Sequence, residues 1–246
     1  THLTDLIEKV GKKNAFTSYL MCRDAIYKLH DIAKRLKSKS EFENKRSIYL
    51  ASVQKDAEKL KREFQLRREA GFEIEFLTGD DLFGEFNLKA PAALVSKDGA
   101  QLNAYRFTME LLNWLTKKDV NIYDKTNAIS FNYGKRGVKI TTDKGNSIIA
   151  KHVIYANGYE AQDYLEDPYG KLHSTYVVAS EPFRELPFDY LLWETARPYV
   201  YMRTTSDFRI IIGGKDEVFY SPGKRDKLIN LKTKQLLHAF KIKFPE

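Results

Sequence analysis

Apolar side chains recur at spacings of three and four along the first part of the chain, the period of a helix that buries one face. The stripe starts just after Asn14, a residue type that caps helix N-termini, and the polar run 37–40 interrupts it. The pattern predicts a helix packed on its own domain, although a coiled-coil seam or a partner surface has the same period. The stripe consists of Ala15, Tyr19, Cys22, Ile26, Leu29, Ala33 and Leu36.

Shorter runs that alternate between apolar and polar residues, or are rich in β-type residues, predict strands between further helices. Residues 46–51 and 72–76 are two such runs, and a helical pattern from Ser52 to Ala70 separates them. Residues 92–96 form another strand candidate, and an amphipathic helix is expected from Asn103 to Lys118. Strand runs interrupted by helices in this way predict a mixed α/β architecture.

The segment from Asp119 to Gly158 has the most detailed pattern in the chain. A short alternating strand is expected at 120–123, followed by a three-strand meander whose runs are 126–131, 138–142 and 148–150. Residues 152–156 are apolar nearly throughout, which predicts a strand buried on both faces. Ala156, Asn157 and Gly158 follow. Small residues after such a strand let the backbone approach a ligand, although an ordinary turn has the same residues.

The last third of the chain is rich in β-type residues and ends in a helix expected at 224–240. Tyr199, Tyr201 and Arg203 alternate onto one face of a predicted strand, and an arginine beside tyrosines suits the carboxylate of a substrate. An ion pair between Arg203 and a surface acid is the competing interpretation. Gly213 and Gly214 either permit close approach of a ligand or mark a bulge at a strand end. The predicted strands are 173–180, 190–194, 199–204 and 209–212.

The net charge of +8 raises the question of nucleic-acid binding. Lysines and arginines are spread over helical patterns such as 55–69 and 223–234, with acids between them in the first, which favours solvated helix faces. We therefore expect no nucleic-acid partner. The length of 246 residues and a hydrophobic content of 43% are those of a globular protein with a substantial core.

Cys22 is the only cysteine, which excludes an internal disulfide and a cysteine-based zinc site and favours a reducing compartment, so we expect a cytoplasmic protein. Cys22 is expected to pack on a helix, with a reactive thiol as the alternative. No apolar run approaches the length of a transmembrane helix, and the first residues lack the pattern of a signal peptide. The five histidines show no ligand spacing, so no metal site is expected.

Four stretches together resemble the FAD-dependent amine and amino-acid oxidoreductases of the D-amino-acid oxidase (DAO) superfamily, and the resemblance extends from about Ile48 to Pro245. It implies that Ala128 contacts the adenine region through its backbone. Ala156, Asn157 and Gly158 would lie near the FAD ribose and pyrophosphate, although the family has a smaller residue at Asn157. The four stretches are 47–52, 93–112, 126–159 and 198–219. The last of them resembles the strands that lie over the flavin ring. For this stretch the resemblance implies that Tyr199, Tyr201 and Arg203 bind the substrate and that Gly213 and Gly214 bind the cofactor.

The sequence departs from the family pattern in two respects. It contains no GxGxxG, the loop that grips the cofactor phosphates, so we expect a central fragment without that loop and without the C-terminal segment that closes the flavin pocket. Some oxidases of the family carry a lysine on the strand matching 209–212, where this chain has three isoleucines. This departure argues against an oxidase that uses oxygen directly.

These observations predict a mixed α+β and α/β fold, with part of a FAD-binding domain containing a β-meander and a substrate domain whose mixed sheet is flanked by helices. The expected function is oxidation of an amine or amino acid by hydride transfer to FAD, with the fragment inactive and unable to retain FAD alone. No catalytic residue and no oligomeric state is assigned. A non-catalytic module that binds protein or nucleic acid through the N-terminal helices is the alternative. The expected parts are N-terminal helices at 1–45, substrate-domain segments at 46–98 and 167–246, and the partial FAD-binding domain at 99–166.

Overall fold

The computed structural model describes residues 2–165 and 170–245, which form two compact units. Unit 1 comprises residues 1–110 and 173–246, and unit 2 comprises residues 111–172. The helix α5 (Ala104–Thr116) passes from one unit into the other. Asn103 caps it, because its Oδ1 accepts a hydrogen bond of 3.0 Å from the backbone N–H of Arg106.

Unit 1 is built around a sheet in which segments from both ends of the chain alternate. The strand order is β2-β3-β1-β8-β9-β10-β7. The neighbours β1 and β8 are parallel, whereas the other pairs are antiparallel, so the predicted mixed sheet is confirmed. The strands are β1 (Glu43–Leu50), β2 (Ile74–Thr78), β3 (Ala92–Gln101), β7 (His173–Ala179), β8 (Leu191–Glu194), β9 (Val200–Thr204) and β10 (Ile210–Val218).

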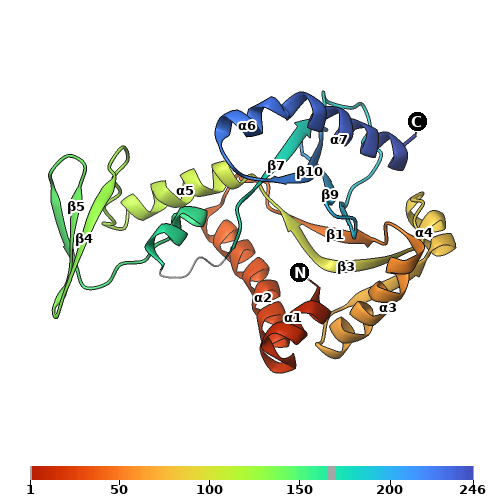
Figure 1. The fold of residues 1–246 in the computed structure, drawn as a ribbon, viewed down its shortest axis with the longest axis horizontal. Helices are drawn as coiled ribbons and strands as arrows, with labels where there is room; N and C mark the ends of the chain where they lie inside the picture. Colours follow the sequence, from red (N-terminus) through yellow and green to blue (C-terminus); the bar gives the residue numbers. More distant parts are fainter. Residues whose placement is uncertain (1, 166–169, 246) are drawn as a thin grey trace. The chain divides into compact units, whose positions relative to one another are not determined.

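Helices cover both faces of this sheet (Figure 1). On one face, α4 and α7 enclose the main core, in which Leu82 and Leu236 meet inward residues of six strands such as Ile48 and Met202. On the other face, α3 covers β1, β2 and β3 through Leu60 and its neighbours. The helices of unit 1 besides α5 are α1 (Leu3–Val10), α2 (Lys12–Leu36), α3 (Gln54–Glu69), α4 (Gly79–Phe86), α6 (Pro222–Lys227) and α7 (Ile229–Lys243).

The apolar stripe of the first predicted helix lies on α2 and is only partly buried. Ala15 and Ala33 are buried, and Ala15 packs in a small core with Leu3 and Ala70. The expectation that Cys22 packs against the domain is wrong, because this residue is exposed on α2. Leu29, on the same stripe, is also 38% exposed, so the helical period overstated how much of this helix is covered.

Unit 2 contains the predicted meander. It consists of β4 (Ala128–Gly134), β5 (Gly137–Thr142) and β6 (Ser147–Ala150), and both pairs are antiparallel. Gly137 needs to be glycine, since its φ is 144° and an added Cβ would lie 2.4 Å from the carbonyl oxygen of Ala150. A 3₁₀ helix, η1 (Gly158–Tyr164), follows the meander.

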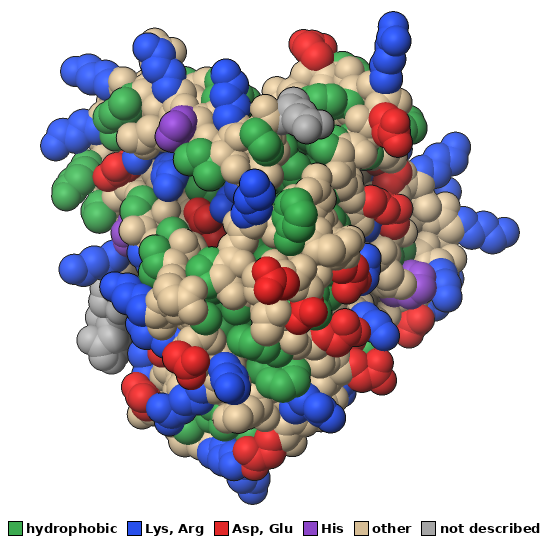
Figure 2. All heavy atoms as spheres, turned by 90° about the vertical axis from the view of Figure 1, so that its right-hand side faces the viewer, with side chains coloured by type: hydrophobic (Ala, Val, Ile, Leu, Met, Phe, Trp, Pro, Cys, Tyr) green, Lys and Arg blue, Asp and Glu red, His purple; other side chains and the backbone are tan. Residues whose placement is uncertain are grey.

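The basic residues are dispersed over the surface. On the face shown in Figure 2, lysine and arginine side chains lie among aspartates and glutamates and do not gather into one patch. Several of them are paired with acids, for example Arg46 with Glu85 at 2.6 Å. Within the part of the chain that the structure describes, no helix has the combination of length and apolar character needed to span a bilayer.

Candidate functional site

The strand β9 presents two chemically different faces. Val200, Met202 and Thr204 are buried in the core, whereas Tyr201 and Arg203 are half-buried on the opposite face of the sheet. The predicted alternation is therefore present in the structure. Tyr199 precedes β9, and its ring centroid lies 6.1 Å from that of Tyr201.

The ring of Tyr201 occupies the space beside Gly213. Gly213 pairs with Tyr201 across β9 and β10, and a Cβ added to Gly213 would lie 2.3 Å from Cζ and Oη of Tyr201. Gly214 has a φ of 125°, and its added Cβ would lie 2.1 Å from the carbonyl oxygen of Tyr199. A register shift follows between Gly214 and Glu217. Packing within the β9–β10 pair is thus enough to explain why both positions are glycine. Contact of Gly213 and Gly214 with a cofactor stays a prediction.

This packing predicts the effect of Gly213→Ala. The added methyl must displace the Tyr201 ring, so we expect a loss of about 2 kcal/mol in the free energy of unfolding, measured by urea denaturation. In a Tyr201→Ala background the ring is absent, and the same substitution should then cost less than about 1 kcal/mol. Equal costs in the two backgrounds would show that the ring of Tyr201 does not require the glycine.

Aromatic side chains continue across the sheet on the same face. Trp193 on β8 pairs with Tyr201 on β9 and with Tyr49 on β1. The rings of Tyr49 and Trp193 stack with centroids 4.0 Å apart, and the indole Nε1 of Trp193 donates a hydrogen bond of 3.1 Å to Oγ of Ser47. Trp193 was not among the predicted site residues, because its place beside Tyr201 depends on the β8–β9 pairing.

Arg203 lines a cavity of about 330 Å³ next to the start of α5. Its Nη1 donates a long hydrogen bond of 3.4 Å to the carbonyl oxygen of Thr204. No salt bridge involves Arg203 within residues 2–165 and 170–245. The competing interpretation of Arg203 as half of a surface ion pair is therefore not what the structure contains, and the guanidinium retains donors for a ligand.

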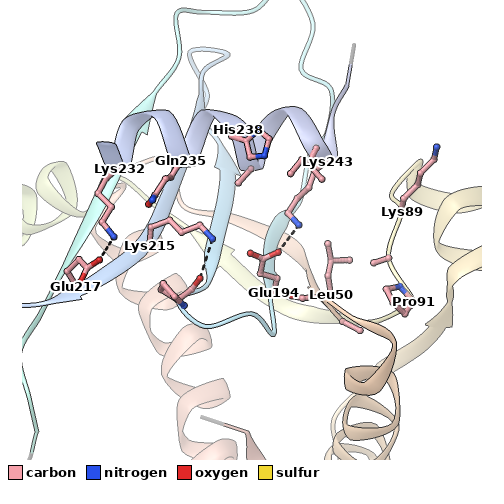
Figure 3. Close-up of a pocket in the computed structure, with 16 residues that line it drawn as sticks. Leu50, Lys89, Pro91, Glu194, Lys215, Glu217, Lys232, Gln235, His238 and Lys243 are labelled. Carbon is pink, nitrogen blue, oxygen red and sulfur yellow. Dashed lines mark hydrogen bonds and ion pairs between the residues drawn. The ribbon is translucent and has the colours of Figure 1, made fainter. Parts of the chain in front are cut away.

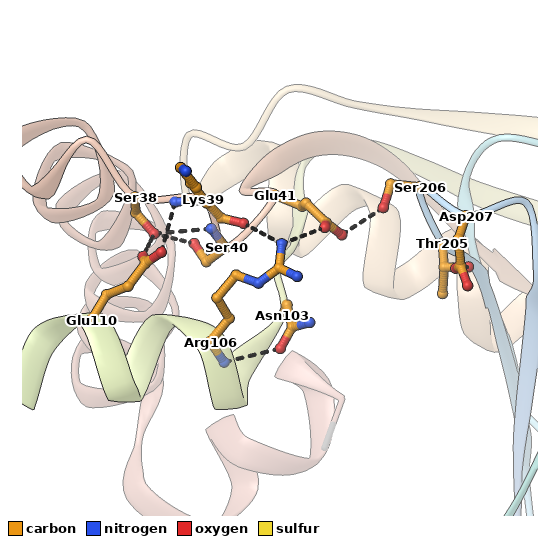
Figure 4. A network of polar contacts seen from close by, with 10 residues as sticks. All are labelled: Ser38, Lys39, Ser40, Glu41, Asn103, Arg106, Glu110, Thr205, Ser206 and Asp207. Carbon is orange, nitrogen blue, oxygen red and sulfur yellow. Dashed lines mark hydrogen bonds and ion pairs between the residues drawn. The ribbon is translucent and has the colours of Figure 1, made fainter.

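The acids around this cavity have partners of their own (Figure 4). Glu41 accepts hydrogen bonds of 2.9 Å from Nη1 of Arg106 and 2.6 Å from Oγ of Ser206. Asp207 lies 2.8 Å from Nε of Arg209. Its hydrogen bonds from Thr205 and Arg209 hold the pKa of Asp207 below its usual value. The acidic rim is thus engaged with groups other than Arg203.

Gln101 adds an acceptor that no sequence pattern indicates. Its Nε2 donates a hydrogen bond of 3.0 Å to Glu43, whereas its Oε1 is buried without a partner among the described residues. Gln101 and Arg203 line the same cavity. An unpartnered acceptor near a guanidinium offers complementary sites for a ligand that has both an amino group and a carboxylate. The two residues are about 100 positions apart in the sequence, and only the folded chain places them at the same cavity.

The predicted cofactor residues of unit 2 lie on the meander and after it. Ala128 is half-buried on β4, opposite Thr142. The prediction of a buried strand at 152–156 is wrong: the segment has no regular structure, and Ile154 is 88% exposed. The strand expected at 120–123 is also absent from the structure. A strand requires a hydrogen-bonded neighbour, and the described sheet of unit 2 consists of β4, β5 and β6 alone.

Aromatic contacts hold the irregular segment against the meander. The ring of Tyr155 stacks on Tyr164 at 4.4 Å, and its hydroxyl lies 2.5 Å from that of Tyr133. Ala156, Asn157 and Gly158 are exposed, and Gly158 has a φ of 65° with open space around an added Cβ. The backbone here is accessible to a ligand, and the small residues fit a group such as a dinucleotide that binds through backbone contacts.

Comparisons with known proteins agree with this architecture. The profile of the family described as FAD dependent oxidoreductase (DAO) matches residues 8–242. No curated protein sequence gives a significant match. Glycine oxidase from Geobacillus kaustophilus is similar in fold, with a TM-score of 0.71 and 19% identity over 90% of this chain and 60% of that one.

Two further solved structures have the same fold. L-proline dehydrogenase from P. horikoshii has a TM-score of 0.71 and 13% identity over 89% of this chain and 62% of that one. The dithionite-reduced L-alpha-glycerophosphate oxidase from Mycoplasma pneumoniae, which has FAD bound, has a TM-score of 0.63 and 14% identity over 73% of this chain and 51% of that one. The chain thus spans about 60% of the length of glycine oxidase and proline dehydrogenase.

Proposed function

Because the chain belongs to the FAD dependent oxidoreductase (DAO) family, we propose that it forms the substrate-facing part of an enzyme that oxidises an amine or amino acid. FAD is the cofactor of this family and, when bound, supplies the hydride acceptor for the carbon that carries the substrate nitrogen. The observation that carries the proposal is Arg203, which faces a cavity without an acidic partner among the described residues. The glycine oxidase and proline dehydrogenase folds support an amino acid as the substrate class.

Each residue of this face has a role in the proposal. Arg203 binds the substrate carboxylate, since a guanidinium forms two parallel, charge-assisted hydrogen bonds with it. Gln101 accepts a hydrogen bond from the substrate amino group through its unpartnered Oε1. Tyr199, Tyr201 and Trp193 provide an aromatic surface that excludes water and orients the substrate. Their common task is to bind and position the substrate.

Four residues of unit 2 are proposed to hold FAD. Ala128 is assigned to the adenine region, and the exposed Ala156, Asn157 and Gly158 to the ribose and pyrophosphate, as in the family pattern. Residues 99–166 would then belong to the cofactor-binding domain. A cytoplasmic location is part of the same proposal, since the single cysteine suits a reducing compartment.

Flavin absorbance tests this proposal. Protein expressed from the full reading frame of the gene should purify yellow, with absorbance at the flavin bands. Residues 1–246 alone should bind no FAD tightly in a titration, because they contain no GxGxxG to bind the phosphates and residues 156–158 lie outside any strand.

Two results would contradict these expectations. Colourless full-length protein that FAD cannot reconstitute would refute the enzymatic proposal. A tight, stoichiometric complex of FAD with residues 1–246 would instead show that a GxGxxG loop is not needed to bind the FAD phosphates. That result would leave the enzymatic proposal intact.

A further inference from the structure

A second cavity, of about 650 Å³, lies under α7 on the face of the sheet opposite to Tyr201 (Figure 3). Leu50 and Glu194, which pair across β1 and β8, form part of its floor, and Leu50 belongs to the main core. Residues of α7 and the loop after α4 form its walls. Because the sheet separates this cavity from the Arg203 face, any ligand here would be distinct from the proposed substrate.

The lining of this cavity carries an excess of positive charge. Four lysines line it against two glutamates, which leaves an excess of two positive charges. Both glutamates are neutralised by a lysine: Lys232 lies 2.6 Å from Glu217, and Lys243 lies 2.7 Å from Glu194. The other two lysines, Lys89 and Lys215, have no carboxylate partner within residues 2–165 and 170–245. An anion is the ligand that this charge distribution favours.

Lys215 lies between the two ion pairs, as Figure 3 shows. Its Nζ donates a hydrogen bond to the carbonyl oxygen of Pro198 at 3.5 Å, the upper limit of such contacts. An ammonium group has three donors, so Lys215 retains donors for a ligand. Its backbone has a φ of 53°, an uncommon conformation for a residue with a Cβ, and its N–H is held at 2.9 Å by the carbonyl of Tyr199. The bulge after Gly214 therefore fixes this lysine at the cavity.

The rest of the lining indicates what kind of anion fits. Gln235 and His238 on α7 add side chains that can donate hydrogen bonds, and no arginine lines the cavity among the described residues. Lysines bind phosphate as point charges, whereas planar carboxylates are usually gripped by arginine. Pro91, Ala239 and Ile242 provide apolar wall for an organic group. The volume is within the range of small-molecule sites.

We propose that this cavity binds a small organic phosphate, with the phosphate group at Lys215 and the organic part against the apolar wall. Phenyl phosphate is a suitable probe and phenol its uncharged counterpart, with binding measured by calorimetry on residues 1–246. Phenyl phosphate should bind saturably in the millimolar range or tighter, and phenol should not. Lys215→Met keeps an unbranched side chain of nearly the same length and should weaken binding about tenfold or more, since it removes the central charge.

Lys234→Met is the matched control, because Lys234 is exposed on α7 and does not line the cavity. It should leave the affinity within about twofold of the original. If Lys215→Met does not fold, which circular dichroism would reveal, Lys89→Met serves as the second variant and should weaken binding at least about threefold. Absence of saturable binding, equal binding of phenol, or wild-type affinity in the lysine variants would each refute the site.

Discussion

Glu63→Gln is expected to lower the free energy of unfolding of unit 1 by about 3 kcal/mol. Glu63 on α3 is fully buried, and its carboxylate accepts hydrogen bonds from the backbone N–H groups of Leu3 at 2.7 Å and Thr4 at 3.1 Å. Nη2 of Arg67 lies 2.7 Å away. The carboxylate thus caps α1 and neutralises a largely buried guanidinium. An amide in its place would replace one accepting oxygen by an NH2 group that faces these donors, and it would leave Arg67 without an opposite charge.

Urea denaturation measures this effect, with Glu69→Gln as the control on the same helix. Glu69 forms an exposed ion pair with Lys12, and both side chains are about half exposed, so its loss should change stability by less than about 0.5 kcal/mol. Equal stabilities for Glu63→Gln and the original protein would contradict the capping role of Glu63.

The Glu63 carboxylate also makes the free energy of unfolding depend on pH, and the direction of this dependence follows from its pKa. Burial alone would raise the pKa of Glu63, but the Arg67 charge and the hydrogen bonds from Leu3 and Thr4 outweigh burial and hold it below the ordinary value of 4.5. A carboxylate with a lowered folded-state pKa contributes stability above its unfolded pKa, and that contribution disappears as the pH falls through the folded pKa. The stability difference between the original protein and Glu63→Gln should therefore shrink below about pH 4.5.

Arg203→Met is the second substitution with a large expected effect, in the flavin-containing protein from the full reading frame. Loss of a charge-assisted contact to the substrate carboxylate should raise the half-saturating amino-acid concentration about 100-fold, equivalent to about 3 kcal/mol. Arg203→Lys keeps the positive charge but not the planar guanidinium. Its half-saturating concentration should therefore lie between those of the original protein and of Arg203→Met. The measurement is the dependence of flavin reduction on substrate concentration.

Arg209→Met controls for the general effect of removing a cation from this hairpin. Arg209 lies beside β10, and its guanidinium is already engaged with Asp207 at 2.8 Å and with the carbonyl oxygen of Ser180 at 2.8 Å. We expect it to leave the half-saturating concentration within about threefold of the original. A similar change in the Arg203 and Arg209 variants would refute a specific contact between Arg203 and the substrate.

Local pattern was enough to predict the strand face that carries Tyr201 and Arg203, and also the meander. The alternation in β9 depends only on period two, so the common face of Tyr201 and Arg203 follows from sequence. The turns of the meander contain glycines that such turns favour, such as Gly137 and Gly145. In both cases the information lies within a few residues of the element that it specifies.

Features that depend on distant parts of the chain could not be predicted in this way. Glu63 lies in a charged helical run that is typical of a solvated face, yet the N-terminus of α1, about 60 residues away, buries it. Gln101 and Arg203 share a cavity only because of the strand order of the large sheet. Residues 152–156 failed as a predicted strand for a related reason, since apolar character favours a strand only where a neighbouring strand is present.

We propose that the sheet face with Tyr201 and Arg203 binds an amino acid or amine for oxidation by FAD. Anaerobic titration of the full-reading-frame protein with a panel of amino acids and amines tests it most directly. We predict that at least one amino acid bleaches the flavin absorbance with a saturable dependence, and that Arg203→Met shifts this dependence to higher concentration. A flavin-loaded protein that no amino acid or amine reduces, or one in which Arg203→Met leaves the dependence unchanged, would contradict the assignment.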